Sequence, residues 1–225
     1  MKIPYHIGVI PDGNRRYSKR ENISLEKAYT VGADIALEMM MWAKHLGVRH
    51  ISFFGTSHEN VLSRSDEEVT DLRKGVIYFC NKVLERGYAL HMVGDVQQIA
   101  QSPKERELFL KLVNNSRVDD VFTVHADVNY SGEIKNELKP LFESVRKYGL
   151  DEVEKNPEKF ISSAGVPSVD LVIRVGGKPR LSGFLPFQTT YSELYFRDEL
   201  WGDFTKEIFT EAIEWFQKQD RTKGA

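Results

Sequence analysis

The sequence predicts an α/β fold in one domain, residues 1–225, with a mainly parallel central sheet flanked by helices. Short apolar runs typical of buried strands alternate with segments whose apolar residues recur every three or four positions. This order favours helices on both faces of the sheet. A chain of 225 residues, 41% of them hydrophobic, can bury a substantial core as a single domain, with two small domains as the alternative.

Local signals mark where the predicted elements begin and end. Gly47 and Gly87 close two long helical patterns, because glycine readily adopts the left-handed conformation that follows a helix. Ser65 and Glu68 form a capping box at the start of the second of these helices. The expected order is a strand at 7–10, a helix from about Ser24, a strand at 50–57, a helix from Ser65, a strand at 89–94, a helix from Ser102–Pro103, a strand at 121–129, a helix from Gly132 to Tyr148, a strand at 170–177 and a helix from Thr205 to Phe216.

Composition and charge exclude several classes of protein. The net charge of −2 gives no general attraction to nucleic acid, so anions must be bound by local clusters of arginine. The single cysteine, Cys80, cannot make an intramolecular disulfide or a thiolate zinc site, and its apolar surroundings predict a buried thiol. The sequence contains neither a run of about 18–20 apolar residues nor a signal-peptide pattern, so we expect a cytoplasmic protein without a transmembrane segment.

The first predicted strand ends in a polar loop, residues 11–16, that carries Asp12 beside Arg15 and Arg16. Ligands of a parallel sheet bind beyond the carboxyl ends of its strands, so this loop belongs to the expected site. Gly13 lets consecutive backbone N–H groups turn toward one anion, and the arginines add charged donors. A carboxylate fits beside a phosphate when Mg²⁺ lies between them. The alternative is an ordinary turn in which Asp12 caps a helix.

The loop after the last predicted strand has a more specific pattern. Arg174 ends the apolar run, two glycines follow, and Arg180 and Ser182 come next. Two guanidiniums and a hydroxyl at this spacing suit one diphosphate. The alternative is a structural arginine that pairs with a carboxylate. Glu193 lies further on, in a segment rich in aromatic residues. Taken alone, it is best interpreted as a half-exposed strand residue.

Five stretches taken together point to a known family. They are "HIGVIPDGNRR", "SHEN", "DLVIRVGGKPRLSGFLPFQ", "YSELYF" and "LWGDF". With these, over nearly its whole length, the chain resembles the cis-prenyltransferases, also called Z-isoprenyl diphosphate synthases, of which undecaprenyl diphosphate synthase is the best-known member. The resemblance implies that family's fold with an apolar tunnel, prenyl diphosphate substrates, Mg²⁺ as cofactor and a homodimer, with no nucleic acid partner. It also leaves room for transient membrane contact during product release.

The resemblance assigns roles to the first loop and to "SHEN". Asp12 matches the aspartate that binds Mg²⁺ and helps the allylic diphosphate to leave. The residues matched to binding of that diphosphate are Gly13, Asn14 and Arg16. Ser57 and Asn60 match residues near the reacting carbons.

Further roles follow for the later part of the chain. Arg174, Arg180 and Ser182 match residues that hold the diphosphate of the second substrate. Glu193 matches the family's second Mg²⁺ ligand, which reaches over from the region of the partner subunit. The side chains expected to line the tunnel, with plain core packing as the alternative for each, are Met39, Met40, Trp42, Phe53, Phe54, Ile77 and Phe79.

The chain departs from the usual family pattern in its first half. Where the family has an arginine and a Gly-His pair, which anchor the allylic diphosphate, the chain has Leu25, Ala28 and Tyr29. Arg15 stands where the family usually has glycine, and it is a candidate to supply one of the lost charges. Arg64 matches a family arginine when one inserted residue is allowed, and Lys178 replaces a glutamate.

These departures are similar to the lavandulyl-type branch of the family, which joins two allylic diphosphates head to middle. The similarity rests on the paired arginines, a "SLxxxY" stretch and "SGFLP", and it adds Arg15, Tyr29 and Arg64 to the expected substrate-binding residues. Head-to-middle condensation with dimethylallyl diphosphate as acceptor is therefore the favoured reaction, and regular cis elongation with isopentenyl diphosphate is the alternative. A non-catalytic partner subunit and a nucleotide-binding module are remote alternatives, because the Asp-Gly-Asn loop is intact and GxGxxG and Walker signatures are missing.

Overall fold

The structure is a computed structural model of the chain. It describes residues 2–94, 100, 102–119, 121–131 and 133–220, with the backbone alone at 59, 60, 129, 134 and 135. The Asn60 side chain and the helix start expected at Gly132 therefore lie outside the described residues. Among the described helices, none combines the length and the apolar character that a membrane crossing requires.

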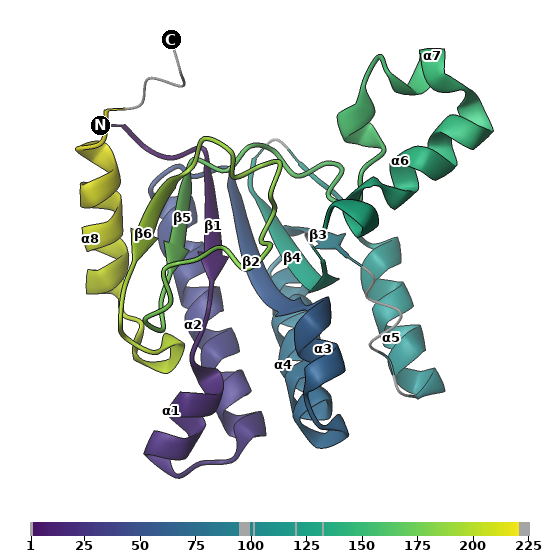
Figure 1. The fold of residues 1–225 in the computed structure, drawn as a ribbon. Helices are drawn as coiled ribbons and strands as arrows, with labels where there is room; N and C mark the ends of the chain where they lie inside the picture. The colour runs from purple at the N-terminus through teal and green to yellow at the C-terminus, as the bar shows by residue number, and fades with distance from the viewer. Residues whose placement is uncertain (1, 95–99, 101, 120, 132, 221–225) are drawn as a thin grey trace.

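A parallel sheet forms the centre of the molecule, with its strands in the order β3-β4-β2-β1-β5-β6 (Figure 1). The strands are β1 (His6–Ile10), β2 (His50–Ser57), β3 (Ala89–Val93), β4 (Thr123–Tyr130), β5 (Leu171–Arg174) and β6 (Glu193–Phe196). The strands expected from the five apolar runs are all present, and β6 is an addition. β6 pairs with β5 at the edge of the sheet and carries partly exposed side chains, so it lacks the continuous apolar run of a central strand.

The predicted helices are present, and the structure adds short helices at 14–21, 58–63 and 150–153 that were not expected. The helices are α1 (Asn14–Glu21), α2 (Leu25–His45), α3 (His58–Ser63), α4 (Asp66–Glu85), α5 (Pro103–Asn114), α6 (Ile134–Tyr148), α7 (Leu150–Val153) and α8 (Lys206–Gln217), with short 3₁₀ helices η1 (Pro157–Lys159) and η2 (Trp201–Asp203). The capping box of Ser65 and Glu68 is present at the start of α4. Most of α1 was expected to be loop, because its sequence is almost wholly polar and it buries Ser18 alone. Tertiary contacts with α2 and η2 hold it in place, including a paired contact of Arg20 with Asp203.

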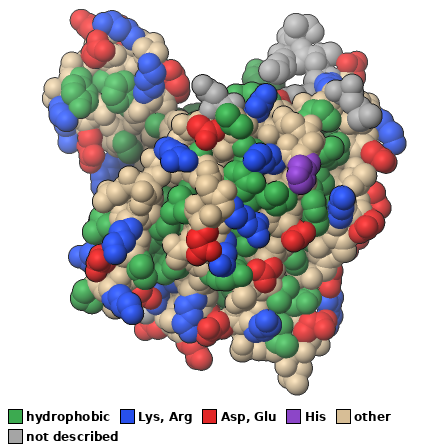
Figure 2. Space-filling view, turned by 180° about the vertical axis from the view of Figure 1, so that it is seen from behind, with side chains coloured by type: hydrophobic (Ala, Val, Ile, Leu, Met, Phe, Trp, Pro, Cys, Tyr) green, Lys and Arg blue, Asp and Glu red, His purple; other side chains and the backbone are tan. Residues whose placement is uncertain are grey.

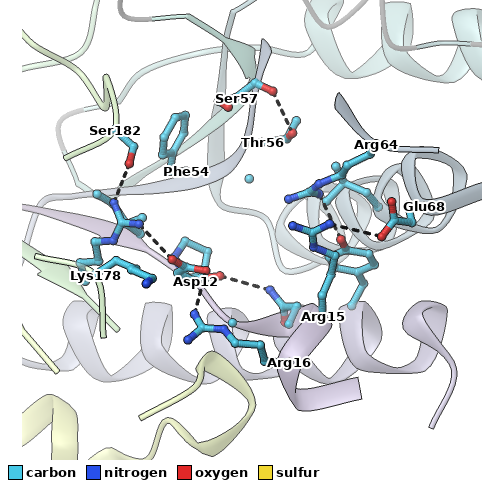
Figure 3. Close-up of a pocket in the computed structure, with 18 of the residues that line it drawn as sticks. Asp12, Arg15, Arg16, Phe54, Thr56, Ser57, Arg64, Glu68, Lys178 and Ser182 are labelled. Atoms are coloured by element: carbon cyan, nitrogen blue, oxygen red, sulfur yellow. Dashed lines mark hydrogen bonds and ion pairs between the residues drawn. The ribbon is translucent and has the colours of Figure 1, made fainter. Parts of the chain in front are cut away.

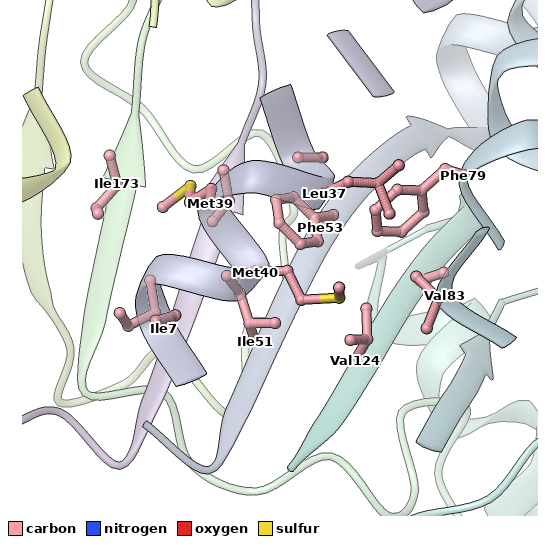
Figure 4. Packing of buried hydrophobic residues seen from close by; sticks show 14 of the residues in the cluster. Ile7, Leu37, Met39, Met40, Ile51, Phe53, Phe79, Val83, Val124 and Ile173 are labelled. Carbon is pink, nitrogen blue, oxygen red and sulfur yellow. The ribbon is translucent and has the colours of Figure 1, made fainter. Parts of the chain in front are cut away.

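Helices α2, α4 and α8 enclose the main core against one face of the sheet (Figure 4). Met39 and Met40 of α2 are fully buried there with Ile7 of β1 and Ile51 of β2. The expectation that the two methionines line a tunnel is therefore wrong, because they belong to a closed core. Such a core fixes the position of α2 against the strands.

The other face of the sheet differs from the expected pattern of helices on both sides. Phe54 and Val172 on this face pack with Val169, Phe184 and Leu185, which lie in the irregular connections before β5 and between β5 and β6. Long connections rather than packed helices therefore cover most of this face. Their return over the sheet brings the loop after β5 next to the loop after β1.

Candidate active site

A pocket of about 1110 Å³ opens at the carboxyl ends of the central strands (Figure 3). It brings together most of the predicted site residues: Asp12, Gly13, Asn14, Arg15, Arg16, Ser57, Tyr29, Arg64, Arg174, Arg180 and Ser182. Seven basic and three acidic side chains line it, whereas the whole chain has a net charge of −2. The pocket therefore carries an excess of positive charge, although the whole protein does not. Such a pocket suits an anionic ligand.

One group of residues, here called the loop cluster, joins the loop after β1 to the loop after β5. It consists of Asp12, Arg16, Arg174, Arg180 and Ser182. Arg174 is 4% exposed and donates hydrogen bonds to the Asp12 carboxylate at 2.9 Å, to the Ser182 hydroxyl at 2.9 Å and to the Arg180 carbonyl oxygen. Arg174 thus pairs with a carboxylate, as the alternative interpretation had it. Its partner is Asp12, the expected metal ligand.

The turn between β1 and α1 places these groups by its backbone. Gly13 adopts a φ of 111° as the residue before α1, and no side chain caps that helix. The interpretation of Asp12 as a helix cap is therefore wrong. The carboxylate instead accepts a hydrogen bond from Arg16 at 3.3 Å, and Arg16 also donates to the Gly176 carbonyl oxygen at 2.9 Å. Asn14 donates its side-chain amide to the Pro11 carbonyl oxygen at 3.2 Å.

A second group, here called the helix cluster, lies across the pocket and consists of Arg15, Tyr29, Arg64 and Glu68. Arg64 donates a hydrogen bond to the Tyr29 hydroxyl at 3.1 Å, and Arg15 pairs with Glu68 at 3.4 Å. Burial raises the pKa of Tyr29, so its hydroxyl stays protonated. The backbone N–H of Ser65, together with Arg15, lowers the pKa of Glu68 and keeps it ionised. The helix cluster thus contains Arg15, Tyr29 and Arg64, three positions that depart from the family pattern.

Asp12 fits the chemistry of a magnesium ligand. Its carboxylate lines the pocket between Arg16 and Arg174, where a bound diphosphate would also lie. Mg²⁺ is usually held by one or two carboxylates together with substrate phosphates and water. In the described part of the chain, no cluster of three or more His, Cys, Asp or Glu side chains suited to a metal occurs.

Glu193 lies outside the pocket of its own chain. Strand pairing places it beside Leu171, at the start of β5, whereas Arg174 ends β5 at the pocket. Three residues of strand correspond to a separation of about 10 Å along the sheet. Any role of Glu193 in metal binding therefore requires a second copy of the chain.

A smaller apolar cavity of about 80 Å³ continues the pocket between α2, α4 and the sheet. Phe53 and Phe79, two of the expected tunnel residues, line it, and Phe54 lines the larger pocket instead. Trp42 and Ile77 were expected in the tunnel as well, but they pack against the main core. The helical spacing of apolar residues could not distinguish cavity-lining positions from core positions.

Some pocket residues were missed by the sequence analysis. Trp201 donates its backbone N–H to the Asp12 carbonyl oxygen at 3.0 Å and its indole N–H to the Gly32 carbonyl oxygen at 2.8 Å. Its place in the "LWGDF" stretch was the available signal. Glu133 also lines the pocket, at the end of the loop after β4. The strand-end rule was applied to the loops after the first, second and fifth strands, so this loop was not selected.

Comparisons with known proteins agree with this geometry. A family model described as "Putative undecaprenyl diphosphate synthase" matches residues 10–224. The isoprenyl transferase of Thermotoga maritima is 30% identical over 232 residues, which cover 100% of this chain and 98% of the relative. The ditrans,polycis-undecaprenyl-diphosphate synthase ((2E,6E)-farnesyl-diphosphate specific) of Haemophilus influenzae is 29% identical, with 99% and 95% covered.

Two solved structures have the same fold. The lavandulyl diphosphate synthase of Lavandula x intermedia, solved with dimethylallyl diphosphate, has a TM-score of 0.83 at 24% identity and covers 99% of this chain and 98% of its own. "A probable undecaprenyl diphosphate synthase" of Campylobacter jejuni has a TM-score of 0.77 at 25% identity over both whole chains. Because the family model spans nearly the whole sequence, the chain belongs to the cis-prenyltransferase family, whose members transfer prenyl groups.

Proposed function

We propose that this pocket condenses an allylic prenyl diphosphate with a second, five-carbon diphosphate. The observation that carries the proposal is the presence of two separate cationic groups, the loop cluster and the helix cluster, in one pocket. Each offers guanidinium donors and a hydroxyl, which is the donor set that a diphosphate takes. The pocket therefore offers cationic groups for two diphosphates, and the apolar cavity continues it.

The chemistry of the condensation matches these groups. The C1–O bond of the allylic substrate breaks, and the diphosphate leaves with the electron pair. The double bond of the acceptor forms a carbon–carbon bond to C1, and a proton lost from the acceptor leaves its electron pair as the new double bond. Arg16 of the loop cluster stabilises the negative charge that develops on the leaving diphosphate, while Arg174 and Arg180 of the same cluster hold the diphosphate of the second substrate. When bound at Asp12, Mg²⁺ would neutralise further charge on the diphosphate.

We propose head-to-middle joining, with dimethylallyl diphosphate as the acceptor, as the mode of condensation. The support is the helix cluster, in which Arg64 bonds to Tyr29 and Arg15 pairs with Glu68, because Arg15, Tyr29 and Arg64 stand where the family pattern is broken. A changed set of diphosphate contacts alters where the acceptor's double bond lies relative to C1. Orientation of the reacting carbons decides between joining modes.

Regular cis elongation with isopentenyl diphosphate is the second candidate. It is supported by the curated relatives, which are isoprenyl transferases and undecaprenyl diphosphate synthases 27–30% identical to this chain. The loop cluster is compatible with either reaction, because both require the same departure of diphosphate.

A substrate panel separates the two candidates. The purified chain with Mg²⁺ would be incubated with dimethylallyl, geranyl, farnesyl or geranylgeranyl diphosphate, each with and without isopentenyl diphosphate, and the products analysed by mass spectrometry. A branched product from allylic diphosphates alone supports head-to-middle joining. Product only in the presence of isopentenyl diphosphate rejects that mode and establishes elongation. A folded protein that gives no product with any pair rejects the proposed function.

We also propose that the chain acts as a homodimer. Phe187, Tyr191 and Leu194 are exposed apolar residues on or just before the edge strand β6, where a single chain leaves them in water. Exposed apolar side chains near a sheet edge are typical of an interface. Figure 2 shows further hydrophobic side chains on the projecting part of the molecule. Phe142 of α6 is also exposed.

The dimer proposal is tested by sedimentation of the purified chain. Dimeric wild-type protein and a monomeric Tyr191→Glu variant are expected, because a charge at this position opposes burial. Glu193→Gln is expected to remain dimeric but to weaken Mg²⁺-dependent turnover. A wild-type protein that is monomeric at assay concentrations and fully active would contradict both the dimer and the assigned role of Glu193.

A further inference from the structure

The condensation releases a proton from the acceptor, in head-to-middle joining and in cis elongation alike. When the new carbon–carbon bond forms, a neighbouring carbon of the acceptor becomes positively charged. A C–H bond beside that carbon then breaks, and its electron pair becomes the new double bond. A base within reach of this C–H bond lowers the barrier to the step.

The described side chains that line the pocket include no histidine and three carboxylates, which are Asp12, Glu68 and Glu133. The Asp12 carboxylate accepts hydrogen bonds from two arginines of the loop cluster and is the expected metal ligand. Glu68 accepts hydrogen bonds from the backbone N–H of Ser65 and from Arg15, and these bonds lower its pKa and weaken it as a base. Glu133 is therefore the pocket carboxylate that has no such role.

Glu133 is held in place by its backbone and not by its side chain. It is the residue before α6, and its carbonyl oxygen accepts hydrogen bonds from the backbone N–H groups of Asn136 at 2.9 Å and Glu137 at 3.0 Å. A side chain at this position often caps the helix, but the Glu133 carboxylate makes no capping hydrogen bond. Within the part of the chain that the structure describes, it also has no ion pair, so it is available to a substrate.

The strand order places Glu133 on the side of the pocket away from the loop cluster. β4 ends at Tyr130, which is in register with Ser57 at the end of β2, and β2 lies between β4 and β1. Two strand spacings, about 10 Å, therefore separate the loop of Glu133 from the loop of Asp12. Ser57, which matches residues near the reacting carbons, lines the pocket between the two loops. A substrate whose diphosphate is held at Asp12 extends its carbons toward this space.

The negative charge of Glu133 suits this place. A carboxylate repels a diphosphate and attracts a carbocation, and the acceptor becomes a carbocation when it joins C1 of the donor. We propose that Glu133 is the general base that removes the acceptor's proton, an inference that rests on the proposed function. One oxygen of its carboxylate takes the proton, the C–H electron pair becomes the new double bond, and the neutral acid then returns the proton to water.

The first test compares kcat and KM of Glu133→Gln and Glu133→Asp with those of the wild-type enzyme. Glutamine keeps the size of the side chain but is not a base, so kcat is expected to fall about 100-fold or more while KM for both substrates stays nearly the same. Aspartate keeps the carboxylate on a shorter side chain, and its kcat is expected to lie between the two. The matched control is Glu143→Gln, at an exposed position of α6 outside the pocket, which is expected to leave kcat unchanged.

Two further measurements distinguish proton transfer from a structural role. With an acceptor deuterated at the carbon that loses the proton, the kinetic isotope effect on kcat is expected to be larger in Glu133→Gln than in wild type, because breaking the C–H bond becomes the slow step. Added formate is expected to restore part of the turnover of Glu133→Ala, because it supplies a carboxylate where the side chain is missing.

The outcomes separate this inference from the proposed function. A folded Glu133→Gln variant with wild-type kcat overturns the inference and leaves the proton to another base, such as the leaving diphosphate. A loss of activity that higher Mg²⁺ concentrations reverse also overturns it, because Glu133 would then be a metal ligand. If Glu133→Gln does not fold, Glu133→Ala decides, since recovery with formate supports the base and no recovery overturns it. A folded wild-type protein that turns over no pair of prenyl diphosphates overturns the proposed function itself.

Discussion

The hydroxyl of Tyr29 accepts a hydrogen bond from the guanidinium of Arg64 at 3.1 Å, at the point where the polar pocket opens into the apolar cavity. Tyr29 thus contributes its ring to the cavity wall and its hydroxyl to the helix cluster. Neither residue acts alone, because the tyrosine fixes the direction in which the guanidinium points. The two contributions can be separated by substitution.

Tyr29→Phe removes the hydroxyl and keeps the ring. The free energy of unfolding is expected to change by about 1 kcal/mol, as for loss of one hydrogen bond. Arg64 is no longer oriented, so kcat/KM is expected to fall about tenfold. Tyr78→Phe, which removes a hydroxyl bonded to Asp34 outside the pocket, is the control. Unchanged kinetics in Tyr29→Phe would show that the hydroxyl does not position Arg64.

Arg174→Lys tests the buried guanidinium of the loop cluster. A lysine keeps the charge but cannot bridge Asp12, Ser182 and the Arg180 carbonyl oxygen together. We expect a loss of about 1–3 kcal/mol in the free energy of unfolding and a fall in kcat/KM on the order of 100-fold. Chemical denaturation and steady-state kinetics measure the two effects. Arg20→Lys, at the exposed pair with Asp203, should leave the free energy of unfolding almost unchanged.

The buried carboxyl of Asp127 predicts a stability that depends on pH. Asp127 lies in register with Phe54 and Val93, and neither carboxyl oxygen has a hydrogen-bond partner among the described residues. Burial, with the nearby charge of Glu137, raises the pKa of Asp127 well above its usual value. The folded protein therefore holds a proton that the unfolded chain releases at lower pH. Stability from this group is present below about pH 4 and is lost as the pH rises through the raised pKa.

Asp127→Asn is expected to become more stable relative to wild type as the pH rises above 4. The difference should grow by up to about 1.4 kcal/mol per pH unit until the wild-type carboxyl ionises. Urea unfolding from pH 5 to 8 measures it. Asp151→Asn, at an exposed position on α7, is the control. A constant difference between Asp127→Asn and wild type would show that this carboxyl does not retain its proton.

A row of three histidines predicts that the protein loses stability at low pH, the opposite of the effect of Asp127. His125 lies between His50 and His91, with ring nitrogens 3.1 Å and 3.0 Å apart. Burial, followed by neighbouring imidazoles, lowers the pKa of His125 well below its usual value, and burial lowers that of His91 to about 4. In the unfolded chain these histidines bind protons near pH 6.5, whereas in the folded protein they stay neutral at that pH. Their contribution to the free energy of unfolding is therefore fully present above about pH 6.5 and is lost as the pH falls.

His125→Asn should lower stability overall but make its dependence on pH shallower between pH 4.5 and 6.5. The expected reduction in slope is up to about 1.4 kcal/mol per pH unit. Unfolding curves at fixed intervals in that range give the slope, and His45→Asn at the exposed end of α2 serves as control. An unaltered slope in His125→Asn would contradict the assignment of this ring as neutral in the folded protein.

Much of the fold and the polar site could be predicted from the sequence. The apolar runs located the strands at 7–10, 50–57, 89–94, 121–129 and 170–177, and the rule that ligands bind at strand ends selected the loops of Asp12 and Arg174. Edge strand β6 was missed because a half-exposed strand has no continuous apolar run. Helix α1 was missed because tertiary contacts, and not an apolar face, hold it.

Other features could not be found without the structure. The register of β4 with β2 and β3 decides that Asp127 is buried, and the sequence around it does not reveal that register. The division of apolar residues between the cavity and the core likewise depends on how α2 and α4 pack together. Phe79 and Met40 belong to equally regular helical patterns, but Phe79 lines the cavity and Met40 does not.

The central claim is that prenyl transfer takes place in the pocket around Asp12. The most direct measurement is product formation from an allylic and a second prenyl diphosphate with Mg²⁺, for the wild-type protein and for Asp12→Asn shown to be folded by circular dichroism. We expect turnover by the wild-type protein and a loss on the order of 100-fold or more in Asp12→Asn, because an amide would hold the Mg²⁺ that stabilises the leaving diphosphate less well. Full Mg²⁺-dependent turnover by Asp12→Asn would contradict the central claim.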